Sequence, residues 1–280
     1  MDNKFRLSFE FFPPKSGNGK DKLVEVKNQL ARYNPEFFSV TYGAGGSTRD
    51  NTKDIVCEFV SHGHATAPHL SFGGDTEDTI AALLQEYKDA GVKRIVALRG
   101  DMPSGMGGAH QMVYANELVT FIREKFGDHF HLEVAAYPEI HPEATSYDAD
   151  IRYLKGKFDA GANSAITQYF FNPDAYFYFI DQCQRAGIDK PIYPGIMPIT
   201  NFVKLARFSD SCGAEIPRWI RKKLQSYGDD IFSIKSFGID LISDLCETLL
   251  DNEAPGLHFY TMNSTEPTTA ILNNLGLDCD

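Results

Sequence analysis

The sequence has few cysteines, no long apolar run and no dense cluster of basic residues. Its cysteines are scattered and form no Cys-x-x-Cys pair, which indicates free thiols in a reducing compartment and argues against a disulfide framework or a structural zinc site. No stretch approaches the ~18 uninterrupted apolar residues of a membrane span. The N-terminal sequence MDNKFRLSFEFFPP carries charges where a signal peptide needs its apolar region. We therefore expect a cytoplasmic protein that does not span a membrane.

The composition limits the class of partner. A net charge of −11, with no Lys/Arg cluster to offset it, argues against a surface that binds nucleic acid. A hydrophobic content of 42% and a charged content of 23% are typical of a globular protein. A chain of this length often forms a single α/β barrel, and no linker or low-complexity segment divides the sequence. We expect one catalytic domain over residues 1–280.

Short strand-like runs alternate with helical periodicity along the chain, which is typical of parallel βαβ units. Three expected helices end in Ala-Gly directly before the next strand, at Ala90-Gly91, Ala160-Gly161 and Ala186-Gly187. Glycine suits the position that follows a helix, so we expect these three helix–strand connections to have the same backbone geometry. The expected strands are residues 6–14, 37–42, 65–72, 94–98, 131–137, 164–171, 191–196 and 257–261.

Eight such strands favour a closed (β/α)8 barrel over an open, doubly wound sheet. Two helical patterns, Pro217 to Tyr227 and Phe232 to Leu250, follow one another without a strand between them. We therefore predict an α/β fold, a single TIM barrel with extra helices before its last strand.

Polar and aromatic residues follow nearly every expected strand, at the end where TIM barrels place their chemistry. No Ser/His/Asp or Cys/His triad, Walker loop or metal-ligand set accompanies them. A barrel end lined by such residues suits the binding of a flat organic cofactor better than it suits hydrolysis without a cofactor. These strand-end residues are Glu10, Thr41, Tyr42, His69, Arg99 to Asp101, Tyr137 to His141, Gln168, the turn from Pro194 to Asn201, and Tyr260 to Thr261.

Glu10 is the one carboxylate in an apolar, aromatic first strand. Strand alternation places Phe9 and Phe11 on one face and Ser8, Glu10 and Phe12 on the other. A buried acid is costly unless it is paired or protonated. Glu10 is therefore either a functional acid or a salt-bridged or edge-exposed structural residue.

The sequence resembles the 5,10-methylenetetrahydrofolate reductase family over ordered stretches that run nearly end to end. The resemblance implies a (β/α)8 barrel that binds FAD non-covalently at its C-terminal mouth. It further implies that NADH or NADPH reduces the flavin and leaves, and that the folate then takes the hydride in a ping-pong mechanism that feeds methionine synthesis. The matching stretches include FEFFPP at 9–14, VTYGA at 40–44, APHL at 67–70, ALRGD at 97–101, AAYPE at 135–139, TQ at 167–168 and HFYT at 258–261.

By this resemblance Glu10 looks like the general acid that protonates a folate nitrogen and opens the five-membered ring to an iminium. The flanking aromatic residues predict a raised pKa that keeps Glu10 protonated near neutrality. Asp101 resembles the acid near the flavin pyrimidine edge, where a negative charge disfavours the anionic reduced flavin and makes it a better hydride donor.

The resemblance also implies binding residues. Arg99 and Lys157 are natural partners for the FAD pyrophosphate, and Gln168 is similar to the residue that hydrogen-bonds the pterin. Lys204 can replace an arginine that many members carry where this chain has Ser264. The implied FAD contacts are Tyr42, Ala44, His69, Arg99, Gly100, Asp101, Tyr114, Ala115, Tyr137, His141, Ala144, Asp150 and Lys157. The implied substrate contacts are Thr41, Asp101, Gln168, Lys204 and Phe208.

Three alternatives remain at this point. One is a flavin-independent relative, or one reduced by another electron-transfer protein. Another is a barrel lyase or transferase in which Lys157 forms a Schiff base, and the third is a non-catalytic binding module. An apolar surface on the helices of residues 214–254 favours a homo-oligomer.

Overall fold

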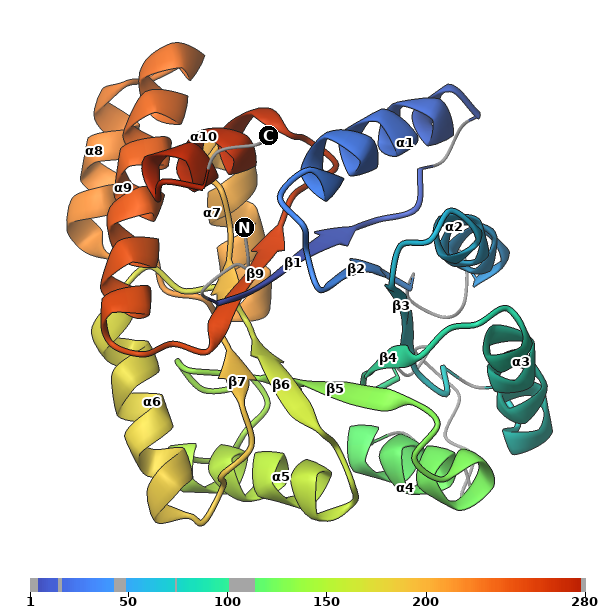
Figure 1. Ribbon diagram of the computed structural model, residues 1–280. Coiled ribbons are helices and arrows are strands. Elements are labelled where there is room, and N and C mark those ends of the chain that lie inside the picture. The colour runs from blue at the N-terminus through green and yellow to red at the C-terminus, as the bar shows by residue number, and fades with distance from the viewer. Residues whose placement is uncertain (1–4, 15–16, 43–48, 74, 101–113, 278–280) are drawn as a thin grey trace.

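The chain forms a ring of parallel strands with helices around it (Figure 1). The computed structural model describes residues 5–14, 17–42, 49–73, 75–100 and 114–277. Within those ranges the strands run in the order β7-β6-β5-β4-β3-β2-β1-β9-β8, and each pairing is parallel. The strands are β1 (Arg6–Phe11), β2 (Phe37–Val40), β3 (Thr66–Leu70), β4 (Arg94–Ala97), β5 (His131–Ala136), β6 (Ser164–Thr167), β7 (Ile192–Tyr193), β8 (Gly195–Ile196) and β9 (Gly256–Tyr260).

Strand seven of the predicted barrel is split into β7 and β8 at Pro194, and this split closes the ring. β7 pairs with β6, while β8 pairs with β9. Proline has no N–H to donate to a ladder, so it interrupts the strand. Gly195 follows because a Cβ at this position would collide with the carbonyl oxygen of Thr167 and the ring of Tyr260.

The helices occupy the outer layer, as the sequence predicted. Side-chain caps begin several of them: Thr76, Ser146 and Asn201 each accept a hydrogen bond from a backbone N–H of the first turn. None of the helices in the described ranges has the length and apolar character needed to cross a bilayer. They are α1 (Gly17–Ala31), α2 (Arg49–Ser61), α3 (Glu77–Asp89), α4 (Ala115–Phe126), α5 (Tyr147–Asp159), α6 (Pro173–Arg185), α7 (Phe202–Cys212), α8 (Arg218–Ser226), α9 (Ile231–Asp251) and α10 (Glu266–Asn274).

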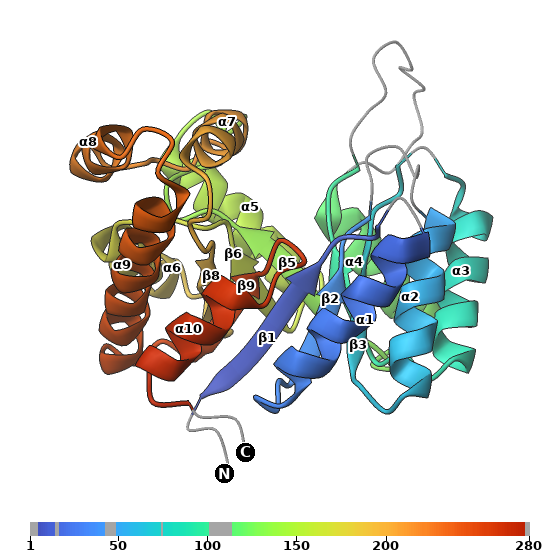
Figure 2. The same cartoon turned by 90° about the horizontal axis from the view of Figure 1, so that it is seen from above.

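The predicted TIM barrel is therefore confirmed, with α8 and α9 as the extra helices before the last strand. Figure 2 shows α7 and α8 at the end of the barrel away from the start of β1. Parallel strands all end on that side, so α7 and α8 lie beside the mouth where TIM barrels carry their active sites.

Strand alternation in β1 separates two environments. Phe9 and Phe11 are fully buried in the layer between strands and helices, where their rings lie 6.0 and 5.6 Å from the ring of Phe38. Ser8 and Glu10 point the other way, into the barrel, toward His258 of β9. The aromatic residues next to Glu10 in sequence are thus not its neighbours in space.

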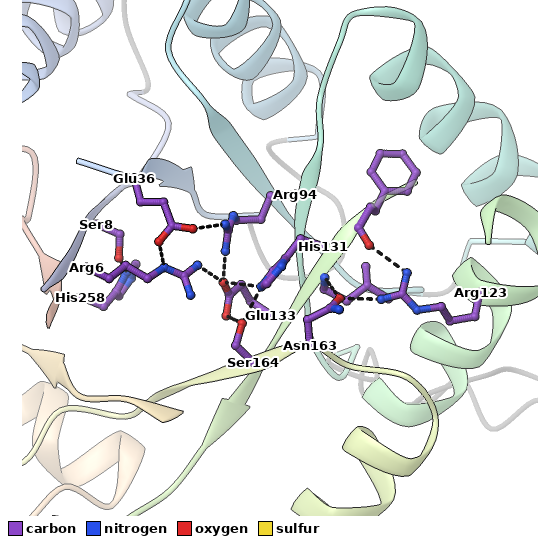
Figure 3. Close-up of polar contacts among 12 residues, drawn as sticks. Arg6, Ser8, Glu36, Arg94, Arg123, His131, Glu133, Asn163, Ser164 and His258 are labelled. Atoms are coloured by element: carbon purple, nitrogen blue, oxygen red, sulfur yellow. Dashed lines mark hydrogen bonds and ion pairs between the residues drawn. The ribbon is translucent and has the colours of Figure 1, made fainter. Parts of the chain in front are cut away.

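The opposite, N-terminal end of the barrel holds a buried network of charges (Figure 3). Glu133 is completely buried and forms ion pairs with Arg6, at 2.6 Å, and with Arg94. Its other oxygen accepts a hydrogen bond of 2.6 Å from Ser164. Glu36 pairs with both arginines at the surface. Because this end of a TIM barrel serves stability, we assign the network a structural role.

Candidate active site

Glu10 contacts two histidines inside the mouth of the barrel. Its Oε2 lies 3.1 Å from Nε2 of His69 on β3 and 3.5 Å from Nε2 of His258 on β9. Nδ1 of His258 is hydrogen-bonded to Ser8 Oγ at 2.8 Å. The side chain of Glu10 keeps 16% of its surface exposed, against 9% for His69 and none for His258. Glu10 is therefore the most exposed member of this trio.

The predicted raised pKa of Glu10 is wrong for this structure. Burial raises the pKa, but the charge of His69 and the contacts of both imidazoles outweigh burial and lower the pKa to about 2. The sequence argument failed because Phe9 and Phe11 lie on the other face of β1. The carboxyl faces His69 and His258 instead of the rings of Phe9 and Phe11.

His258 is the site residue that sequence reasoning missed. The sequence places it in the matching stretch 258–261 but predicts no role for it. The available signal was its position on the last strand, which neighbours the first strand in any closed barrel. The register places His258 beside Ser8 and Tyr260 beside Glu10.

Four of the predicted cofactor residues meet where β5 leads into α5. The rings of Tyr137 and His141 lie 4.5 Å apart, nearly perpendicular. The backbone N–H of His141 donates to Oδ2 of Asp150 at 2.8 Å. The amine of Lys157 donates to the carbonyl oxygen of Ala135 at 2.9 Å. Loop and helix thus present both hydrogen-bonding groups and a cation at one place.

Arg99, which follows β4, reaches the same cluster. It forms an ion pair with Glu143, whose Oε1 accepts from Nη2 at 2.9 Å. The backbone N–H of Glu143 in turn donates to Nδ1 of His141 at 3.0 Å. Burial lowers the pKa of Lys157 to about 8, and the charge of Arg99 acts in the same direction while Asp150 opposes it. An anion between the two cations would relieve this repulsion.

These residues fit a dinucleotide cofactor with a diphosphate, because Arg and Lys are its usual partners. Gly100 packs against the segment that follows β3: a Cβ there would lie 2.8 Å from the backbone nitrogen of Gly73, so glycine is required for this contact. Tyr42 follows β2, Tyr114 directly precedes α4 and Ala115 begins it, and Ala144 follows β5. Ala44 and Asp101 lie outside the described residues.

The predicted substrate residues within the described ranges lie on the mouth side of the barrel. Thr41 follows β2, and its N–H donates to the carbonyl oxygen of Phe11 at 2.8 Å. Gln168 follows β6 and accepts from the N–H of Tyr169 at 3.0 Å. Phe208 and Lys204 are one turn apart on α7, both exposed, and the ring of Phe208 stacks on Tyr169 at 6.3 Å. In the described ranges no group of three or more His, Cys, Asp or Glu residues could hold a metal ion.

The fold and this mouth define the chain as a TIM-barrel enzyme. The family model for methylenetetrahydrofolate reductase matches residues 1–276. The chain is 40% identical to the 5,10-methylenetetrahydrofolate reductase of Escherichia coli K12, over 99% of this chain and 93% of that protein. It is 37% identical to "Methylenetetrahydrofolate reductase (NADH) 1" of Arabidopsis thaliana, over 97% of this chain and 48% of that protein.

The chain belongs to the methylenetetrahydrofolate reductase family, whose members are oxidoreductases. A solved structure also shares its fold, with a TM-score of 0.65 and 17% identity over 96% of this chain and 93% of that one. That neighbour is a protein from Clostridium thermocellum that binds two copies of 5-methyl-5,6,7,8-tetrahydrofolic acid.

Proposed function

We propose that the chain reduces 5,10-methylenetetrahydrofolate to 5-methyltetrahydrofolate with NADH or NADPH, through FAD and in a ping-pong mechanism that feeds methionine synthesis. Family membership supports the reaction. The observation that carries the assignment of the site is the position of Glu10, an acid held between two histidines inside the mouth. The "(NADH)" in the name of the plant relative supports a nicotinamide reductant.

The cofactor site consists of the cluster around α5 and the strand ends beside it. Arg99 and Lys157 bind the diphosphate, and Gly100 lets the backbone approach. His69, Tyr42 and Tyr137 line the mouth next to this cluster, and Ala44, Asp101, Tyr114, Ala115, His141, Ala144 and Asp150 complete the set. When bound, FAD supplies a two-electron carrier that accepts a hydride from one substrate and delivers it to the other.

Glu10 protonates a folate nitrogen and so opens the five-membered ring to an iminium. A carboxyl with a pKa of about 2 holds no proton at neutrality in the substrate-free protein. Because burial raises the pKa of this carboxyl, a bound folate that displaces water favours the protonated form of Glu10. Glu10, the most exposed member of the trio of Glu10, His69 and His258, then gives this proton to the folate nitrogen.

The folate lies between the strand ends and α7. Gln168 hydrogen-bonds the pterin, Thr41 contacts the folate or the nicotinamide, and Asp101 acts beside both. Phe208 offers an exposed ring against which an aromatic group stacks. Lys204, on the same exposed stripe of α7, takes the carboxylate of the glutamate tail.

The chain also forms a homo-oligomer in this proposal. Trp219 on α8 and Phe232 on α9 expose 59% and 82% of their surface, which is unusual for side chains of this size. Sedimentation analysis of the wild type should give the mass of more than one copy of the chain. Phe232→Glu should shift the sedimenting species toward the monomer. A wild type that itself sediments as a monomer would contradict this part of the proposal.

The function is tested by the colour of the purified protein and its response to its substrates. The protein should be yellow, bleach when NADH or NADPH is added without oxygen, and regain colour when 5,10-methylenetetrahydrofolate follows. A colourless protein would contradict the flavin, and a bleached protein that the folate fails to reoxidise would contradict the substrate.

The low pKa of Lys157 also suits a Schiff-base lysine, a second candidate chemistry. Borohydride added with the folate should leave Lys157 unmodified if the proposed reaction is right. Covalent trapping at Lys157 would favour the lyase or transferase alternative.

A further inference from the structure

Tyr169 joins the end of β6 to α7. The residue is fully buried, and its hydroxyl lies 2.9 Å from Ser209 Oγ on α7. The thiol of Cys212, at the end of the same helix, donates to this hydroxyl at 3.5 Å. The ring stacks on Phe208 at 6.3 Å and meets the ring of Tyr260 edge-on at 6.4 Å.

Leu205 and Ser209 are the buried residues of α7, and Phe202, Ala206 and Cys212 pack against the core while partly exposed. Apolar packing of this kind has less directional preference than a hydrogen bond. A buried serine hydroxyl that lost its partner would pay the cost of desolvation, so the bond to Tyr169 favours one rotation of the helix. Burial raises the pKa of Tyr169, which keeps the phenol protonated and able to hydrogen-bond.

That rotation decides where Phe208 and Lys204 point. Phe208 precedes Ser209 in sequence, and Lys204 lies one helical turn before Phe208, so both lie on the exposed stripe of α7. Tyr169 also donates its backbone N–H to the side chain of Gln168 at 3.0 Å. One residue therefore contacts both the helix and the glutamine to which we assign folate binding.

We propose that Tyr169 is a positioning residue for the folate: its hydrogen bond to Ser209 holds α7 so that Phe208 and Lys204 face the mouth. This inference rests on the proposed function. Tyr169 acts through α7 and Gln168, and it leaves the contacts of Glu10 with His69 and His258 unchanged.

The test uses the holoenzyme with Tyr169→Phe, Ser209→Ala and the double variant. The KM for 5,10-methylenetetrahydrofolate should rise about fivefold in each single variant, the change expected from one hydrogen bond between neutral groups, with kcat nearly unchanged. Amide hydrogen exchange in residues 202–212 should become faster, while flavin content stays at the wild-type level. The double variant should be no worse than either single variant, because both remove the same bond.

Tyr176→Phe is the matched control. The Tyr176 hydroxyl is also buried and donates to the carbonyl oxygen of Ile192 at 2.8 Å, but it lies on α6. This variant should lose similar stability without changing the KM or the exchange of residues 202–212.

Wild-type KM and wild-type exchange in Tyr169→Phe would overturn the inference, as would additive effects in the double variant. A wild-type protein that fails to reduce the folate would instead overturn the proposed function. Hydrogen exchange of α7 would then still decide whether Tyr169 holds the helix.

Discussion

The carboxylate of Glu10 and the imidazole of His69 lie 3.1 Å apart although β2 separates their strands in the sheet. The contact is formed across the interior of a closed ring, where side chains from alternate strands meet in one layer. It explains why Glu10 is ionised despite burial, because the neighbouring histidines stabilise the charged form. The acid and the two histidines are thus held in one place.

The charge network at the N-terminal end of the barrel should carry stability and not activity. Glu133→Gln removes the buried partner of Arg6 and Arg94, and we expect it to lower the unfolding free energy by about 3–5 kcal/mol. Glu36→Gln affects the same two arginines, but this side chain is 41% exposed, so its cost should stay near 1 kcal/mol, about the value of a surface pair.

Denaturant unfolding measures both variants, and the flavin content and NADH-driven bleaching of the folded protein should match the wild type. Equal costs for Glu133→Gln and Glu36→Gln would contradict the assigned burial. Selective loss of bleaching in Glu133→Gln would contradict a purely structural role.

Cofactor affinity should depend on the protonation of Lys157. Its pKa of about 8 means that the amine loses its charge as the pH rises through 8, and a diphosphate gains most from the charged form. FAD affinity of the apoprotein should therefore fall as the pH rises above 8. Lys157→Arg should remove this pH dependence, because arginine stays charged, and Lys157→Ala should weaken binding at every pH.

Fluorescence titration of the apoprotein with FAD measures this dependence. A pH-independent wild type, or Lys157→Arg that follows the wild-type curve, would show that another group governs binding.

Glu139 should make the folded state less stable at alkaline pH. Burial raises its pKa from 4.5 to about 7, the charge of Glu215 adds to this, and the N–H of Glu215 opposes it with a hydrogen bond of 2.8 Å. The folded protein then binds a proton that the unfolded chain releases between pH 4.5 and 7, so this stability is lost as the pH rises through that window.

Glu139→Gln removes the titration while its amide oxygen can still accept from Glu215. The variant should be more stable than the wild type above pH 7 by about 1 kcal/mol, after allowance for solvent screening. Below pH 4.5 the two should be equal. Thermal unfolding across this range checks the sign, and a variant less stable than the wild type above pH 7 would refute it.

The sequence predicted the helices and strands better than the contacts between residues far apart in the chain. Strand starts, the three Ala-Gly helix ends and the two helices before β9 were predicted because they depend on local periodicity and on Gly positions. The expected strands 6–14 and 164–171 run beyond the ends of β1 and β6. The split at Pro194 was not predicted, because strands of two residues have no periodicity of their own. The pKa of Glu10 was predicted in the wrong direction, since its direction depends on His69 and His258, far along the chain. The binding and catalytic roles assigned to the site residues stay predictions, and Ala44 and Asp101 lie outside the described residues.

Single-turnover kinetics of Glu10→Gln test the central claim most directly. The variant replaces the acid with an uncharged group of the same size, so hydride transfer from NADH to FAD should proceed at close to the wild-type rate. Reoxidation of the reduced enzyme by 5,10-methylenetetrahydrofolate should be lost almost completely, because no proton reaches the folate nitrogen. If both half-reactions slow equally, or if folate reoxidation survives, Glu10 is not the acid of this reaction.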